Sequence, residues 1–258
     1  KTFGGKDDSQ RNIRIFARTI IPFLEEENKD KSATLDDHSS NLPKKLDEKT
    51  MVRYCPIAPG EYLIKVASDN IKKAKLTNVV ELKHHKSNYE NVNEFAPLMR
   101  SGKFQKNIIL VLGTILASYE INDFLFKLSN GMFKGDYAII GNAVRRGERF
   151  VEIEKYKHKS FDNWFMPLMK ALGFKKGEVE YDAKFRNNRM ESFYKIKKDK
   201  KIKYDGKEIN FKKGDEILVF KLYKYYPKEL NKFLKMYFSE VKMVSDPEKE
   251  YALALCEK

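Results

Sequence analysis

One stretch of the chain combines a buried-strand pattern with a glycine at which a ligand could bind. Residues 107–119 read Asn-Ile-Ile-Leu-Val-Leu-Gly-Thr-Ile-Leu-Ala-Ser-Tyr. A continuous apolar run closed by a turn predicts a strand buried on both faces, as in a parallel sheet. Because open α/β sheets bind ligands outside the carboxyl ends of their strands, Gly113 and Thr114 are candidate ligand-contacting residues. A core strand with an ordinary strand-to-helix turn explains the same pattern.

A second candidate ligand site lies at the start of the sequence. Residues 1–5 indicate the end of a strand that runs into a turn at Gly4 and Gly5. Ser9 suits the N-cap of a following helix, whose expected apolar face is Ile13, Phe16, Ile20, Phe23 and Leu24. Backbone N–H groups at such a turn can bind an anion or a cofactor. Two glycines alone do not separate this from an ordinary turn.

Strand and helix patterns alternate through the first part of the chain. Residues 25–50 are polar and aperiodic, and 27–50 are assigned as a long loop. Strands are expected at 52–57, 78–82, 107–112 and 137–140, and helices at 61–76, 91–99 and 121–128. This alternation predicts a parallel sheet flanked by helices, with right-handed crossovers.

The pattern changes after Gly141. Asp205-Gly206 lies between two strand-like segments, which is a hairpin signal. We expect helices at 145–156, 161–172 and 227–238, and strands at 192–197, 201–204, 216–222, 241–244 and 252–255. The sequence therefore predicts an α/β domain of residues 1–142 and 239–258, and an appended helical and antiparallel domain of residues 143–238.

The composition limits the class of protein. No run of about 18 apolar residues occurs, so no membrane span is expected. The two Cys and four His form no metal-ligand spacing, so no metal site is assigned and a reducing, cytoplasmic location is expected. No signal-peptide pattern is present, and a start at Lys1 without Met indicates a processed or truncated N-terminus.

The charge is strongly positive, with 51 Lys and Arg against 37 Asp and Glu, a net +14. Such a balance suits nucleic acid, an anionic membrane surface or an anionic substrate. Most of the cations are Lys, spread along the whole chain, and Lys is a point charge rather than a bidentate reader of bases. We therefore disfavour nucleic acid as the partner.

Short segments in a fixed order indicate a family. They are Gly4-Gly5 with Ser9, Tyr54-Cys-Pro56, Asn88-Tyr89, Leu112-Gly-Thr-Ile-Leu-Ala-Ser118, Asn188-Arg-Met-Glu191, Phe211-Lys-Lys-Gly-Asp-Glu-Ile217, Lys224-Tyr225 and Asp246-Pro247. In this order and spacing the chain resembles, from about Gly4 to its C-terminus, the histidine-specific S-adenosylmethionine-dependent methyltransferases. The type member is the histidine Nα-methyltransferase of ergothioneine biosynthesis. The helical region that normally precedes the first strand is missing.

The resemblance implies a Rossmann-like methyltransferase sheet, a smaller substrate domain and S-adenosylmethionine as cofactor. It implies methyl transfer from a sulfonium to an unprotonated amine, which requires in-line positioning and no metal. No catalytic residue is assigned. The cofactor-binding residues it implies are Gly4, Gly5, Ser9, Asn88, Tyr89, Gly113 and Thr114. The substrate-binding candidates are Ser118, Asn163, Phe220 and Leu222.

The departures from the family pattern fall at the sites. Ala58 replaces a carboxylate that binds the ribose. Asn88 replaces an Asp that accepts from adenine, and an amide oxygen can still accept. Ser118 replaces the Asn that holds the substrate amino acid, while Phe220 and Leu222 replace a Glu and a Ser that hold the imidazole. Histidine is therefore not the expected substrate. Losing two or three hydrogen bonds of about 1 kcal/mol each would weaken cofactor binding by a factor on the order of 100.

Two functions remain open from the sequence. One is N-methylation of a small amine or amino-acid-like molecule other than histidine. The other is a catalytically degenerate relative that binds a protein partner. Glu61 is either a substitute for the missing ribose carboxylate or a first-turn helix acid. Phe220, Leu222, Tyr223 and Trp164 suggest an apolar or aromatic pocket, and ordinary core packing explains them equally.

Overall fold

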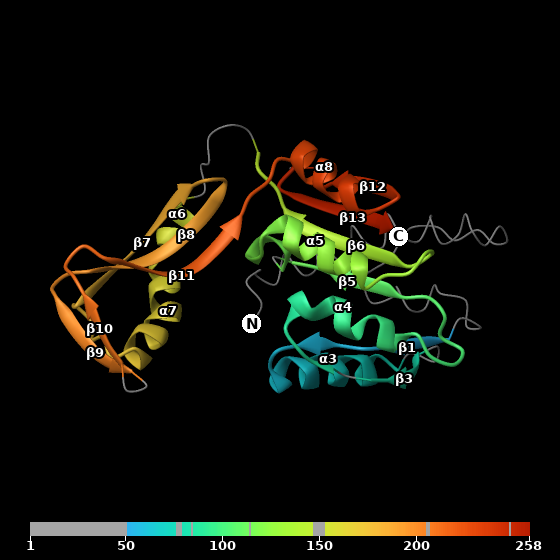
Figure 1. The fold of residues 1–258 in the computed structure, drawn as a ribbon, viewed down its shortest axis with the longest axis horizontal. Coiled ribbons are helices and arrows are strands. Elements are labelled where there is room, and N and C mark those ends of the chain that lie inside the picture. Colours follow the sequence, from blue (N-terminus) through green and yellow to red (C-terminus); the bar gives the residue numbers. More distant parts are fainter. Residues whose placement is uncertain are drawn as a thin grey trace. The chain divides into compact units, whose positions relative to one another are not determined.

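The computed structural model of the protein describes residues 51–75, 79–83, 85–113, 115–146, 153–204, 207–247 and 249–258 (Figure 1). The predictions for Gly4, Gly5, Ser9, Thr114 and the loop 27–50 concern residues outside these ranges. The chain divides into two compact units, Lys1–Val144 with Pro227–Lys258, and Arg145–Tyr226.

The main sheet of the first unit has four strands in the order β12-β13-β6-β5 (Figure 1). Strand β5 (Ile108–Val111) runs parallel to β6 (Tyr137–Ala143), as predicted. Strand β13 (Tyr251–Glu257) is antiparallel to β6 and to β12 (Glu240–Ser245), which confirms the expected final hairpin.

Strand β6 carries the core of this sheet. Its residues Ala138, Ile139 and Ile140 are fully buried. Strand β5 lies at the edge of the described sheet, and its Ile108 and Leu110 are 51% and 47% exposed. Ile108 and Leu110 share one face of the strand, while Ile109 and Val111 on the other face are better buried. The prediction that this strand is buried on both faces is therefore wrong for the described residues, which cover only one face of β5.

Two short parallel pairs continue the α/β pattern. Strand β1 (Val52–Tyr54) pairs with β3 (Val79–Leu82), and β2 (Ile57–Ala58) pairs with β4 (His85–Lys86). Pro56 separates the pairs because it has no N–H to donate to a ladder, although its carbonyl accepts from the His85 N–H at 3.2 Å. Helix α3 (Glu61–Ala74) connects β2 to β3, in agreement with the predicted helix.

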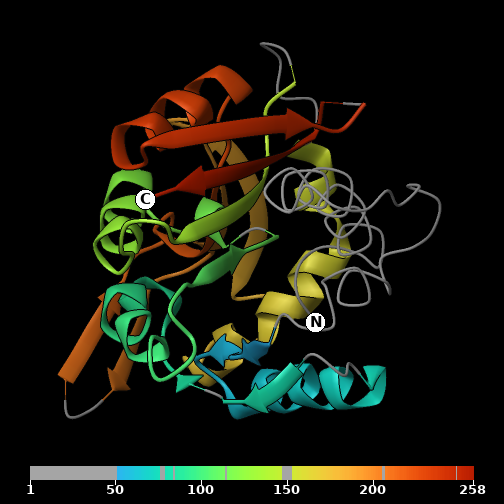
Figure 2. The same ribbon diagram turned by 90° about the vertical axis from the view of Figure 1, so that its right-hand side faces the viewer.

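The helices of the first unit follow the apolar periodicity. Helix α5 (Ile121–Asn130) begins where the Glu120 carboxylate accepts from the Asp123 N–H at 3.0 Å. It lies beside α8 (Pro227–Tyr237) (Figure 2), and the Tyr237 hydroxyl donates to Asn122 Oδ1 at 3.1 Å. Shorter helical segments are η1 (Tyr89–Asn91), α4 (Val92–Phe95), η2 (Pro97–Met99) and η3 (Leu116–Ser118). Among the described helices, none has the length and hydrophobicity to cross a bilayer.

Helix α8 belongs to the first unit, whereas the sequence analysis placed 227–238 in the appended domain. Its apolar residues Leu230 and Leu234 are fully buried, and its end is fixed where Ser129 Oγ donates to the Tyr237 carbonyl at 3.0 Å. Packing against α5 therefore decides its place.

The second unit is an antiparallel sheet with two helices, α6 (Ile153–Lys157) and α7 (Lys159–Ala171). The sheet has the order β11-β8-β7, from β11 (Glu216–Tyr223), β8 (Arg189–Ile196) and β7 (Val179–Arg186). A separate hairpin of β9 (Lys200–Tyr204) and β10 (Lys207–Phe211) confirms the signal at Asp205-Gly206. The expected α/β class with antiparallel strands is thus confirmed.

Two elements of this unit differ from the sequence-based expectation. Strand β7 was not predicted, although its residues alternate between apolar and charged. A helix was expected from Arg145, but Arg145 and Arg146 are not helical, and the described helix α6 begins at Ile153.

Candidate functional site

Gly113 lies two residues after the end of strand β5, in a conformation that favours glycine. Its φ is +81°, and a Cβ added there would meet no atom of the described residues within 4 Å. The backbone therefore turns sharply here, and glycine permits close approach of a ligand to the main chain. This matches the position at the carboxyl end of a parallel strand where the sequence analysis placed a ligand.

Tyr251 holds this turn from a distant part of the chain. Its hydroxyl accepts from the Gly113 N–H at 3.2 Å and faces the Gly113 carbonyl at 3.5 Å. The side chain is only 7% exposed and passes over Gly141 of β6, where an added Cβ would overlap the hydroxyl. Gly141 thus provides the room that lets β13 support the end of β5. Sequence reasoning missed Tyr251, because no local signal links residues 138 positions apart.

The second group of candidates lies at the carboxyl ends of β2 and β4. The Ser87 N–H donates to the Ala58 carbonyl at 3.2 Å, so residues 58 and 87 are neighbours. Asn88 precedes η1 and makes no side-chain capping bond. Its amide can therefore accept from or donate to a ligand. Ala58 is 3% exposed and offers only a methyl group.

Tyr119 connects these two groups. The pKa of the Tyr119 phenol is raised mainly by burial, and the nearby Glu90 and Tyr89 raise this pKa further. The Tyr119 ring stacks on Phe124 with centroids 5.3 Å apart. Tyr89 and the segment that follows Gly113 are therefore close in the folded chain. Ser118 is half-buried in the same segment.

Glu61 behaves as a first-turn helix acid. It is the first residue of α3, and its side chain is 81% exposed. Lys86 Nζ lies 2.9 Å from Glu61 Oε1, and this hydrogen bond lowers the pKa of the carboxyl. Its pairing with Lys86 favours this interpretation over a replacement for the ribose carboxylate.

The substrate candidates of the second unit lie in two environments. Phe220 joins an aromatic cluster through Phe165, with ring centroids 5.6 Å apart, and Trp164 meets Phe165 edge-on at 4.5 Å. Trp164 is 52% exposed, whereas Leu222 is 3% exposed and packs in the core. Asn163 is exposed in α7 and directly precedes Trp164 of this cluster in the sequence. Of the residues for which the sequence suggested an apolar or aromatic pocket, Phe220 and Trp164 both contact Phe165, and the pocket itself stays a prediction.

No group of metal-ligating side chains occurs within the part of the chain that the structure describes. Cys256 is fully buried, and burial raises its pKa to about 12. Such a thiol is not a nucleophile at neutral pH. The described site is therefore built from backbone, amide, hydroxyl and aromatic groups.

Comparison with known proteins identifies the family. A family model described as "Histidine-specific methyltransferase, SAM-dependent" matches residues 33–258. The chain therefore belongs to the histidine-specific S-adenosylmethionine-dependent methyltransferase family, whose cofactor is S-adenosylmethionine. No curated protein matches the chain.

Two solved structures are similar to the chain at low sequence identity. An S-adenosylmethionine-dependent methyltransferase from Clostridium acetobutylicum ATCC 824 is 15% identical, with 96% of this chain and 91% of that chain covered and a TM-score of 0.47. The PH0226 protein from Pyrococcus horikoshii OT3 is 10% identical, and the match covers 95% of this chain and 90% of that chain with a TM-score of 0.44.

The described residues fit this cofactor in part. No described atom lies within 4 Å of a Cβ built at Gly113, so the described residues leave room for a ligand against this backbone, and the Asn88 side chain makes no capping bond. The methyl group of Ala58 cannot accept from a ribose hydroxyl. We expect a site that binds the cofactor with fewer hydrogen bonds than the family pattern provides.

Proposed function

We propose that this chain is an S-adenosylmethionine-dependent N-methyltransferase that acts on a small amine or amino-acid-like substrate other than histidine. The observation that carries the proposal is the Gly113 turn, open to a ligand and held by Tyr251 at the end of a parallel strand. A main-chain turn fixed by a buried side chain suits a pre-organised binding site.

The bound cofactor supplies a methyl group on a sulfonium. The residues of this chain would hold and orient the molecule that carries it. Gly113 lets the backbone approach, and the Asn88 amide oxygen would accept from the adenine amino group. The half-buried Tyr89 ring lies next to Asn88 and offers an aromatic surface. Methyl transfer then requires an unprotonated amine placed in line with the methyl group.

The second unit supports a substrate other than histidine. Phe220 and Leu222 have no group that could hydrogen-bond an imidazole. A buried polar ligand left without partners loses about 1–3 kcal/mol per group. The Phe220 and Phe165 rings favour an apolar portion of the substrate instead.

The test is methyl transfer from labelled cofactor to a panel of small amines and amino acids. We expect transfer to at least one member of the panel and none to histidine. Asn88→Ala should raise the KM for the cofactor about three- to tenfold, the equivalent of one hydrogen bond. Asn210→Ala changes an exposed Asn in β10 and is the matched control. Transfer to histidine alone would contradict the proposal.

A catalytically degenerate relative that binds a protein partner is the second candidate. It is favoured by Ala58, whose buried methyl group stands where the family pattern has a ribose acceptor. Such a protein would show no transfer to any amine and no affinity for the cofactor. Cofactor binding therefore separates the two candidates.

A further inference from the structure

One buried amide in the main sheet of the first unit has an oxygen without a partner. Asn142 lies in β6 and is fully buried. Its Nδ2 donates to the Ala143 carbonyl at 2.9 Å, and this bond fixes which way the amide points. The other amide atom, Oδ1, is buried as well and accepts no hydrogen bond from the residues that the structure describes. A buried acceptor without a partner destabilises a fold, so its presence requires an explanation.

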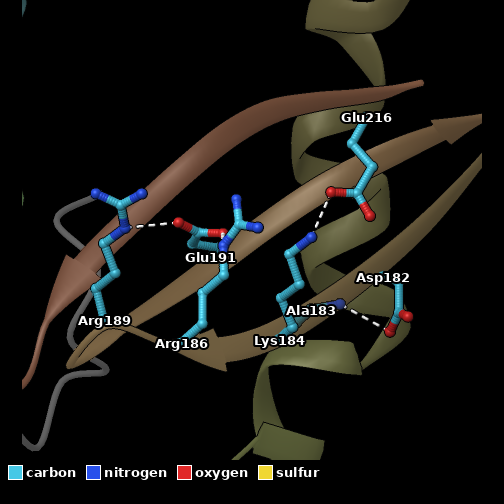
Figure 3. Close-up of polar contacts among 7 residues, drawn as sticks. All are labelled: Asp182, Ala183, Lys184, Arg186, Arg189, Glu191 and Glu216. Carbon is cyan, nitrogen blue, oxygen red and sulfur yellow. Dashed lines mark hydrogen bonds and ion pairs between the residues drawn. The ribbon is translucent and has the colours of Figure 1, made fainter.

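Glu191 in the second unit is also fully buried, but ion pairs compensate it. Its two oxygens lie 2.6 Å from Arg186 Nε and 2.5 Å from Arg189 Nε. Figure 3 shows the two arginines on either side of this carboxylate. The Asn142 oxygen has neither an ion pair nor a hydrogen bond among the described residues.

The neighbours of Asn142 on its face of the sheet are apolar. Successive residues of a strand point to opposite faces, so Asn142 shares a face with Ile140. On the adjacent strand β13, Ala252 lies opposite Asn142 and Ala254 lies opposite Ile140. All three neighbours are buried. A buried water needs several polar partners, and these three side chains offer it none.

Asn142 lies at the same edge of the sheet as the Gly113 turn. Val111 of β5 pairs with Ile140 of β6, so two further residues along these parallel strands bring Gly113 beside Asn142. Tyr251 contacts the same turn, where its hydroxyl accepts from the Gly113 N–H at 3.2 Å. The unpartnered oxygen therefore belongs to the edge at which a sheet of this class binds its ligand.

A neutral amide oxygen suits the N–H of an unprotonated amine. A nitrogen that donates an N–H to Oδ1 keeps its lone pair for the methyl group. A carboxylate would favour the protonated amine instead, because an opposite charge stabilises the charged form. In the transfer, the lone pair forms the N–C bond, the S–C bond breaks with its electron pair left on the sulfur, and one proton passes from the nitrogen to water.

We propose that Asn142 Oδ1 accepts from the N–H of the amine substrate and so restricts methyl transfer to amines that carry an N–H. Primary and secondary amines meet this requirement, whereas a tertiary amine has no N–H to donate. Methylation of a primary amine therefore stops at the dimethylated product. This inference rests on the proposed methyl transfer.

The first test follows the products of each active amine by mass spectrometry. Its primary, monomethylated and dimethylated forms serve as separate substrates. We expect the primary form to gain up to two methyl groups and no third. The kcat/KM of the dimethylated form should be at least tenfold below that of the monomethylated form, because it leaves the buried oxygen without a donor. Equal kcat/KM values for these two forms would overturn the inference.

Asn142→Leu removes the amide from the site at similar size. It should lower the kcat/KM of the monomethylated form at least tenfold and change that of the dimethylated form less than twofold, so that the discrimination disappears. Discrimination that survives in this variant would overturn the role of Asn142.

Asn107→Leu is the matched control. The Asn107 Nδ2 also donates to a backbone carbonyl, that of Ala96 at 2.9 Å. Asn107 directly precedes β5, at the opposite end of that strand from Gly113. The control should keep the discrimination between the two amine forms. Its loss in both variants would overturn the site in favour of a general effect of removing an amide.

A binding measurement on the unaltered protein separates this inference from the proposed function and requires no variant to fold. N-methylaniline and N,N-dimethylaniline differ by one N–H, and both are uncharged at neutral pH. In ¹⁵N-labelled protein we expect the first and not the second to shift the NMR signal of the Asn142 side-chain amide. Equal shifts, or no shift with either, would overturn the site. If no amine is methylated but N-methylaniline alone shifts this signal, the proposed function fails and the amine site stands.

Discussion

At the scale of the residue, Tyr251 connects the candidate cofactor site to a distant strand. Its hydroxyl bonds to the Gly113 N–H, so a side chain of β13 fixes the turn that follows β5. Gly113 itself could be identified from the sequence, because an apolar run broken by glycine is a local pattern. Tyr251 could not, because its role depends on the placement of β13 next to β6.

Tyr251→Phe removes this hydrogen bond and keeps the ring. We expect the affinity for S-adenosylhomocysteine to fall about three- to tenfold, the loss expected for one hydrogen bond of about 1 kcal/mol. Calorimetric titration measures it, and Tyr62→Phe at a 73% exposed position is the control. An unchanged affinity for both variants would show that the turn does not depend on Tyr251.

Glu191 makes the stability of the protein depend on pH. Its pKa is lowered in the folded state, so it stabilises the fold above its unfolded pKa of about 4.3 and loses this contribution as pH falls through the lower folded value. Glu191→Gln should reduce the free energy of unfolding by about 2 kcal/mol at pH 7. The difference from the unaltered protein should shrink towards pH 3.

Urea unfolding at several pH values measures this difference. Glu240→Gln, at an exposed position in β12, is the control and should show no such pH dependence. If the difference in the free energy of unfolding between Glu191→Gln and the unaltered protein stayed constant from pH 7 to pH 3, the stabilisation would not come from the ionised Glu191.

At the scale of elements, local periodicity predicted most strands and helices. Helix α5, the β9–β10 hairpin and the β12–β13 hairpin all follow from apolar spacing or turn residues. The sequence of strand β7 also alternates between apolar and charged residues. The strand was not predicted because half of its residues are charged. The exposure of Ile108 and Leu110 could not be predicted, because it depends on which elements flank β5 in space.

The packing of β13 over β6 leads to a prediction at this scale. An alanine at Gly141 would place its Cβ against the Tyr251 hydroxyl and ring. Gly141→Ala should therefore destabilise the protein by about 1–3 kcal/mol. In a Tyr251→Phe background the substitution should cost less, because the hydroxyl that it meets is gone.

A double-mutant cycle measured by urea unfolding quantifies this coupling. We expect an interaction energy of about 1 kcal/mol between the two substitutions. Strictly additive effects would show that Gly141 and Tyr251 do not meet as the structure has them.

At the scale of the whole molecule, the order of short motifs predicted the family, and the family model confirms it over residues 33–258. The expected α/β class with antiparallel strands is confirmed too. The sequence could not show which unit contains α8, because that depends on contacts with α5. Nor did it indicate the arginine pair on Glu191, since Arg186 meets Glu191 across the β7–β8 hairpin.

The central claim is that this chain retains a working cofactor site despite Ala58. Calorimetric titration of the full chain with S-adenosylhomocysteine tests it most directly, because this ligand occupies the site without reacting. We predict that one molecule binds per chain with a Kd in the micromolar range, which corresponds to a binding free energy of about −8 kcal/mol. No detectable binding at millimolar ligand would contradict the claim and favour the degenerate relative that binds a protein partner.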